Sequence, residues 1–89
     1  MTSELSPDFL TCFRRLPKRI KQQARNNYRL WKKNPRHPSL EFKRVGRKSA
    51  TYSVRIGLGW RALGLLEEDA ITWFWIGSHA EYDRLLKEA

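Results

Sequence analysis

A histidine and a tyrosine directly follow the most apolar stretch of the chain. The run WFWIGSHAEYD, residues 73–83, changes from large apolar side chains to polar ones within a few positions. Histidine imidazoles exchange protons near neutral pH, which suits them to general acid–base chemistry. We therefore expect His79 to carry a proton in a reaction, or else to cap the following helix or bind a neighbouring turn. Tyr82 is expected to act beside it by stacking or donating its phenolic proton, or else to pack into the core.

Two arginines stand in otherwise apolar or weakly polar strings. Arg61 lies within GWRALGLL and Arg55 within TYSVRIG, and a short glycine-containing stretch separates them. If the two segments pair as strands, both guanidinium groups can lie on one face and hold a phosphate. The alternative is that each arginine pairs with an acid across the sheet, such as Glu67 or Glu81.

The positive charge of the chain is concentrated in its first two thirds. The formal net charge is +9, and of the 18 Lys and Arg residues 16 lie in residues 1–61, together with only 3 of the 9 acids. A field this one-sided exceeds what solubility needs and predicts a polyanionic partner, either nucleic acid or an acidic protein. Four cations in the middle of the chain are expected to make nonspecific phosphate contacts, or else to be plain solvated charges: Lys43, Arg44, Arg47 and Lys48.

The composition predicts one soluble domain over residues 1–89, without a metal or another cofactor. Cys12 is the single cysteine, and with only His37 and His79 beside it no zinc-type spacing exists. The first residues lack a basic leader before an apolar block, and no segment approaches the roughly 18 apolar residues of a membrane span. We expect a cytoplasmic protein that does not contact a membrane.

The elements that would position these residues begin with two helices. Ser6-Pro7-Asp8 reads as an N-cap, a first helical position and a first-turn acid, and apolar residues then repeat at helical spacing to about Leu16. Pro17 opens a second helix with an apolar stripe from Ile20 to Trp31. These helices form a hairpin, and the proline-containing residues 34–39 form an extended connector.

From residue 40 the apolar period changes to that of strands. LEFKRV, residues 40–45, is expected to be an edge strand, and TYSVRIG, residues 51–57, a half-buried strand with Thr51, Ser53 and Arg55 facing out. Residues 51–77 form a three-stranded meander, and HAEYDRLLKEA forms a short C-terminal helix. The predicted fold class is α+β: an N-terminal helical hairpin on a small antiparallel sheet of three to four strands, with a short C-terminal helix.

This order of elements resembles the RelE/ParE toxin superfamily of bacterial type II toxin–antitoxin systems. The resemblance covers residues 9–86 and is carried by NPRHPSLEFKRV, YSVRIGLGWRALGLL and WFWIGSHAEYDRLL. Most members open with an apolar strand, for which TSELS offers only a few suitable residues. Whether this first strand forms is left open by the sequence.

The resemblance implies one of two activities. The first is ribosome-dependent, metal-independent cleavage of mRNA, which requires a base, an acid and cations, and for which His79, Arg61, Arg55 and Tyr82 are the catalytic candidates. The second makes the chain a binding module, either a DNA gyrase inhibitor or an inactive member that binds antitoxin and DNA. Some nucleases of the superfamily carry lysines at the position of Ser53, whereas others use histidine in a segment like GSH. In either case an acidic antitoxin is the expected partner.

Overall fold

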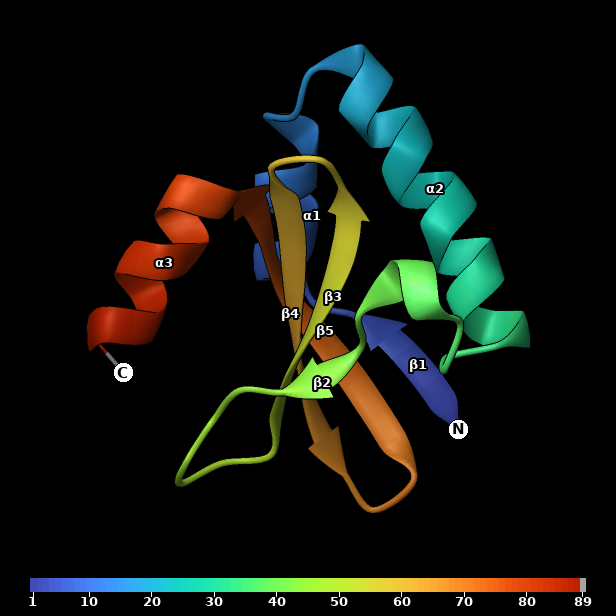
Figure 1. The fold of residues 1–89 in the computed structure, drawn as a ribbon, viewed down its shortest axis with the longest axis vertical. Coiled ribbons are helices and arrows are strands. Elements are labelled where there is room, and N and C mark those ends of the chain that lie inside the picture. Colours follow the sequence, from blue (N-terminus) through green and yellow to red (C-terminus); the bar gives the residue numbers. More distant parts are fainter. Residues whose placement is uncertain (89) are drawn as a thin grey trace.

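Two helices precede the meander strands in this computed structural model, which describes residues 1–88 (Figure 1). Helix α1 spans Pro7–Arg14, and Ser6 caps it by accepting a hydrogen bond from the amide of Phe9 at 3.1 Å. Helix α2 spans Lys18–Lys33 after Pro17 and buries Ile20, Ala24 and Trp31, as the apolar stripe predicts. Within residues 1–88 there is no helix of the length and apolarity that a membrane span requires.

The predicted meander is present in full. Strands β3 (Thr51–Gly57), β4 (Trp60–Glu67) and β5 (Ala70–Ser78) pair antiparallel in sequence order, and helix α3 (His79–Glu88) follows β5 without a break. Asn27 of α2 donates hydrogen bonds to two carbonyl oxygens of β3, those of Arg55 at 3.1 Å and Ile56 at 2.6 Å. The α+β fold class is confirmed.

The sheet has five strands in the order β1-β5-β4-β3-β2, rather than three to four. The added strand is β1 (Thr2–Leu5), which pairs parallel with β5, so the sheet is not purely antiparallel. Ser3 fixes this strand to the core, because its hydroxyl lies 2.7 Å from the Tyr28 hydroxyl and accepts a hydrogen bond from the Trp73 indole at 3.2 Å. The polar side chain of Ser3 is therefore compatible with a strand, since its hydrogen bonds are made inside the molecule.

The prediction of a strand over residues 40–45 is wrong for most of its length. Pro38–Leu40 form a short 3-10 helix, Glu41 adopts the left-handed conformation (φ 44°, ψ 44°), and β2 comprises only Lys43–Arg44. Leu40 is completely buried, so the chain must turn inward before it can pair with β3. The burial of Leu40 therefore decides the local structure, and the partial alternation of apolar and polar residues in LEFKRV does not produce a full strand.

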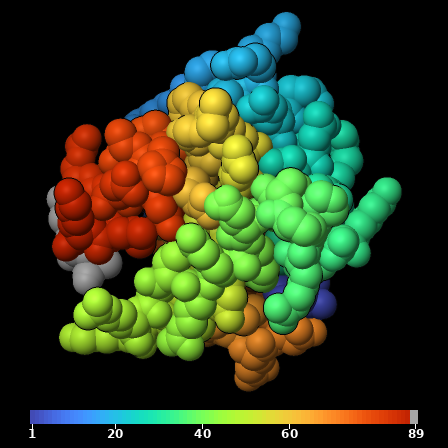
Figure 2. All heavy atoms as spheres, viewed as in Figure 1, coloured from blue at the N-terminus to red at the C-terminus, as the bar shows by residue number. Residues whose placement is uncertain are grey.

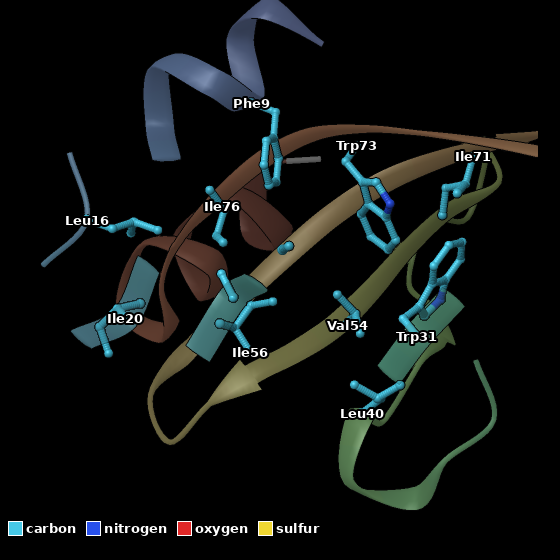
Figure 3. Close-up of a cluster of buried hydrophobic side chains, with 12 residues drawn as sticks. Phe9, Leu16, Ile20, Trp31, Leu40, Val54, Ile56, Ile71, Trp73 and Ile76 are labelled. Atoms are coloured by element: carbon cyan, nitrogen blue, oxygen red, sulfur yellow. The ribbon is translucent and has the colours of Figure 1, made fainter. Parts of the chain in front are cut away.

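The core lies between the helical hairpin and one face of the sheet, here called the core face (Figure 3). Trp31 is buried in this core, with its ring edge-on to Trp73 at 5.4 Å and to Phe42 at 5.7 Å between ring centroids. From the strands, Val54, Ile56 and other apolar side chains point to the same cluster. This packing holds the sheet rigid from one side.

The opposite face of the sheet carries Ser53, Arg55 and Arg61 and is here called the site face. The prediction that Ser53 faces solvent is wrong, because the residue is completely buried. Helix α3 and the turn at Glu41 cover part of this face, as the ion pair from Glu41 to Arg61 and the packing of Tyr82 against Arg61 show. The hairpin and α3 thus lie on different sides of the sheet (Figure 1).

Candidate functional site

The two arginines singled out in the sequence lie side by side on the site face. Arg55 of β3 is the direct register partner of Arg61 of β4, so their side chains project from the same face, as predicted. They differ in accessibility, because the Arg55 side chain is 40% exposed and that of Arg61 only 7%. Arg55 is therefore open to a ligand, whereas Arg61 lies beneath the surface.

The guanidinium of Arg61 is held by contacts on several sides. Its Nε donates to the Ser53 hydroxyl at 2.7 Å, and one terminal nitrogen donates to the carbonyl oxygen of Glu41 at 3.3 Å. The other terminal nitrogen lies 3.5 Å from a carboxylate oxygen of Glu41. A buried charge is tolerable when it is paired and hydrogen-bonded in this way. Arg61 is thereby fixed as a positive charge in the floor of the site.

Glu41 is the functional candidate that the sequence reasoning missed. Its two carboxylate oxygens face different arginines, one at 3.5 Å from Arg61 and the other at 4.0 Å from Arg55. The alternative that each arginine pairs with an acid is therefore confirmed, although the acid is Glu41 and not Glu67 or Glu81. One signal was available, since Glu41 is the only acidic residue between Asp8 and Glu67 in the most basic part of the chain.

Helix α3 begins where β5 ends and brings Tyr82 over the site face. Ser78 caps the helix, because its hydroxyl accepts from the Glu81 amide at 3.3 Å and donates to the Glu81 carboxylate at 3.1 Å. Tyr82 is buried, and the guanidinium carbon of Arg61 lies 5.3 Å from the centroid of its ring. In this position Tyr82 packs against Arg61, in accord with the packing alternative.

His79 is accessible at the edge of the same cluster. Its side chain is 50% exposed, its Nε2 lies 3.4 Å from a carboxylate oxygen of Asp83, and its ring lies 5.4 Å from that of Tyr82. Its backbone amide donates to the carbonyl of Gly59 at 2.7 Å, which ties the start of α3 to the turn between β3 and β4. Because Ser78 provides the helix cap, the imidazole is available for another role.

The four cations predicted to contact phosphates lie in β2 and in the loop that follows it, next to the site face. Lys43 of β2 pairs with Ser53 and so belongs to the site face, while Arg44 bends back to the carbonyl oxygens of Gly46 and Ser49 at 3.2 and 3.4 Å. Arg47 and Lys48 are exposed in the loop after β2. Figure 2 shows the surface indented between α3 and this loop. The site face thus has an accessible imidazole at the start of α3 and exposed cations in the loop after β2.

Within residues 1–88, the site face contains no group of side chains of the kind that binds a metal ion. Among residues 1–88, no three or more His, Cys, Asp or Glu side chains come together as they would around a metal ion. The ionisable side chains on the site face and at its edge are one imidazole, two carboxylates and two guanidinium groups: His79, Asp83, Glu41, Arg55 and Arg61.

Solved structures of similar fold come from several toxins. RelE of Pyrococcus horikoshii OT3, solved with RelB, has a TM-score of 0.68 at 12% identity over 88% of this chain and 93% of that chain. RelE of Methanococcus jannaschii, also solved with RelB, has a TM-score of 0.72 at 14% identity over 91% and 96%. YafQ of E. coli strain BL21(DE3) has a TM-score of 0.72 at 15% identity over 90% and 94%. At sequence identities of 12–15%, these matches show that the folds are similar and no more than that.

Sequence comparison supplies the family. No curated protein sequence gives a significant match. The family model of the ParE-like toxin domain, however, matches residues 18–84, which include α2, all strands except β1, and most of α3. The resemblance seen in the sequence is thus confirmed, and the chain belongs to the ParE-like toxin domain family of the RelE/ParE superfamily.

Proposed function

We propose that this protein is the toxin of a type II toxin–antitoxin system and cleaves mRNA on the ribosome without a metal ion. The observation that carries the proposal is the placement of Glu41 between Arg55 and Arg61, with His79 beyond Tyr82 on the same face. One carboxylate, one imidazole and two guanidinium groups are the side chains that such a cleavage requires.

The proposed reaction uses the RNA's own 2′-hydroxyl as nucleophile. A base removes the proton of that hydroxyl, the 2′-oxygen attacks the adjacent phosphorus, and the bond from phosphorus to the 5′-oxygen breaks. An acid then protonates the departing 5′-oxygen. The products are a 2′,3′-cyclic phosphate on one fragment and a 5′-hydroxyl on the other, so protons and electron pairs balance without water or metal.

Each group of the site has a role in this scheme. Glu41 and His79 are the two proton carriers, since Glu41 is the carboxylate that lies between the two arginines and His79 is the accessible imidazole of the cluster. Arg55 is exposed enough to contact the reacting phosphate directly. Arg61 supplies a fixed positive charge below it, held in place by Ser53 and by the ring of Tyr82.

The remaining surface fits the proposed target and partner. Lys43, Arg47 and Lys48 border the site and would hold the RNA backbone on either side of the cut. An acidic antitoxin suits a toxin with a net charge of +9. The two archaeal RelE proteins were each solved with a RelB partner, which supports a protein partner for this chain as well.

Induced expression in a bacterial host tests the proposal. We expect growth arrest together with new ends in ribosome-bound transcripts mapped by primer extension, while DNA gyrase continues to supercoil plasmid in a purified assay. Growth arrest without transcript cleavage, but with loss of supercoiling, would replace this proposal with the gyrase alternative. Absence of both effects would leave an inactive member that only binds antitoxin and DNA.

A further inference from the structure

A hollow with a mixed lining lies where α1 ends, β4 begins and β5 continues into α3. Its volume is about 220 Å³. Two tryptophans line it, Trp60 and Trp75, and each is only partly buried. The lining also includes two exposed charged residues, Arg15 at the end of α1 and Glu81 in the first turn of α3. Aromatic rings together with a few convergent polar groups are typical of a site for a planar, polar ligand.

This hollow is next to the site face. Gly77 is the register partner of Arg61, and a Cβ atom at Gly77 would lie 2.5 Å from a ring carbon of Trp75. Because register partners project to the same face of a sheet, the Trp75 ring lies against β5 on the face that carries Arg61. Glu81 follows His79 by two residues on α3. A nucleotide beside a phosphate bound at the site is therefore close to the hollow.

Arg15 and Glu81 bring opposite charges to the hollow without neutralising each other. Among residues 1–88, no ion pair joins these two side chains, and Arg15 has none with another acid. The Glu81 carboxylate accepts a hydrogen bond from the Ser78 hydroxyl at 3.1 Å. A ligand with acceptors toward the guanidinium and donors toward the carboxylate would satisfy both groups.

We propose that the hollow binds a guanine base of RNA. The O6 and N7 atoms of guanine accept hydrogen bonds from a guanidinium group, and its N1–H and N2 amino groups donate to a carboxylate. Adenine and cytosine carry an acceptor beside their amino group, which a carboxylate repels, and uracil has one N–H between two carbonyls. The tryptophans add a stacking surface that favours a base over a free phosphate.

This inference rests on the proposed function in taking the ligand to be RNA, and it adds which base the protein selects. Short RNAs that cannot be cut test it without cleavage. The probe is a labelled, 2′-O-methylated pentanucleotide of uracils with a central guanine, and the controls carry adenine or cytosine at that position and the same charge. We expect the guanine RNA to bind about tenfold more tightly in fluorescence anisotropy. Equal affinities would show binding through phosphates alone and overturn the inference.

Cys12 reports where the base is bound, because it is the single cysteine of the chain and it lines the hollow. Alkylation of its thiol by iodoacetamide should slow when the guanine RNA is bound, and should slow much less with the adenine RNA at the same concentration. Unchanged alkylation at saturating guanine RNA would place the base elsewhere and contradict the assignment.

Matched variants test the two charged groups. Arg15→Gln and Glu81→Gln should each reduce the preference for guanine to about twofold or less, because each removes one of the two charged contacts. Glutamine at position 81 still offers an oxygen to the α3 cap. Arg14→Gln and Glu67→Gln, at exposed residues outside the hollow, should retain the preference. Equal preference in a variant and its control would refute the role of that charge.

The positions of cuts in transcripts separate this inference from the proposed function. We expect guanine at one fixed position relative to the cut, and we expect Glu81→Gln to lose that bias. Cleavage by the unmodified protein without such a bias would refute the guanine site alone. Selective binding of the guanine RNA by a protein that never cleaves transcripts would refute only the nuclease assignment.

Discussion

At the scale of single residues, the site depends on a carboxylate that sits between two guanidinium groups. Glu41 compensates the buried charge of Arg61 and also faces the more exposed Arg55. A phosphate that reaches Arg55 would approach this carboxylate closely, and a base must lie within about 3 Å of the hydroxyl that it deprotonates. The ion pair seen here thus places a candidate base beside the cation that would bind the substrate.

Removal of the carboxylate charge tests the role of Glu41. Glu41→Gln keeps the size and the backbone carbonyl that Arg61 contacts, so the fold should persist. We expect transcript cleavage to fall about 100-fold or more, the usual contribution of a general base. Glu67→Gln, at an exposed acid at the end of β4, is the matched control. Equal cleavage by both variants would exclude Glu41 as the base.

The two histidines of the chain allow a similar comparison for the acid. His79→Gln should lower cleavage about 100-fold or more while leaving RNA binding nearly unchanged. His37→Gln, in the connector where His37 contacts Ser39, should be as active as the unmodified protein. Cleavage that survives in His79→Gln, measured on ribosome-bound transcripts, would move the proton transfer to another group.

Some of these residue relationships could be predicted from the sequence and others could not. The shared face of Arg55 and Arg61 follows from two strands joined by a tight turn, since the strand period fixes side-chain direction. The position of Glu41 depends on the turn at Pro38–Leu40 and on a left-handed backbone, neither of which has a periodic signal. The burial of Ser53 likewise depends on side chains from other elements, among them Arg61 of β4, whose Nε donates a hydrogen bond to its hydroxyl.

At the scale of elements, the site rests on a sheet that is packed from both sides. The helices and the meander were predictable because capping residues, apolar stripes and turn residues are local signals. Strand β1 was not, because its four residues gain their stability from parallel pairing with β5 near the other end of the chain. Nonlocal pairing of this kind leaves little trace in a short polar segment.

The sheet has no free space for a side chain at Gly64. A Cβ atom there would lie 2.7 Å from a ring carbon of Trp73 and 2.8 Å from a side-chain carbon of Ile71. Gly64→Ala should therefore lower the free energy of unfolding by about 1–3 kcal/mol, the usual cost of overpacking. Thermal unfolding followed by circular dichroism measures this decrease. A variant as stable as the parent would show that Trp73 can move aside freely.

At the scale of the whole molecule, charge and shape divide the protein into two surfaces. The site face has His79 at the start of α3 and the cations Arg47 and Lys48 in the loop after β2, while the helical hairpin has an apolar groove, lined by residues such as Phe13 and Tyr28, beside the basic α2. The net charge of the sequence predicts a polyanionic partner, but charge alone does not indicate which surface serves which partner. The two surfaces are separate because neighbouring residues in a strand point to opposite faces of the sheet, so that Arg55 and Arg61 lie on the site face and Val54 and Ala62 on the core face.

The salt dependence of RNA binding should distinguish these two surfaces. Removal of one cation that binds a phosphate lowers the slope of log affinity against log salt by about 0.7 for single-stranded RNA. Arg47→Ala and Lys48→Ala should each reduce the slope by roughly that amount. Lys33→Ala, at the end of α2, should not. A larger effect of Lys33→Ala, measured by fluorescence anisotropy of labelled RNA, would place the RNA on the hairpin instead.

The chemical ends of the cleaved transcript test the central claim most directly. If Glu41 and His79 move protons while the 2′-oxygen attacks the phosphorus, the fragments carry a 5′-hydroxyl and a 2′,3′-cyclic phosphate or its hydrolysed 3′-phosphate. End-specific labelling of transcripts cut on purified ribosomes reads out both ends. We predict labelling by polynucleotide kinase without prior phosphatase treatment. Fragments with a 5′-phosphate and a 3′-hydroxyl, as attack by metal-activated water leaves, would contradict the account.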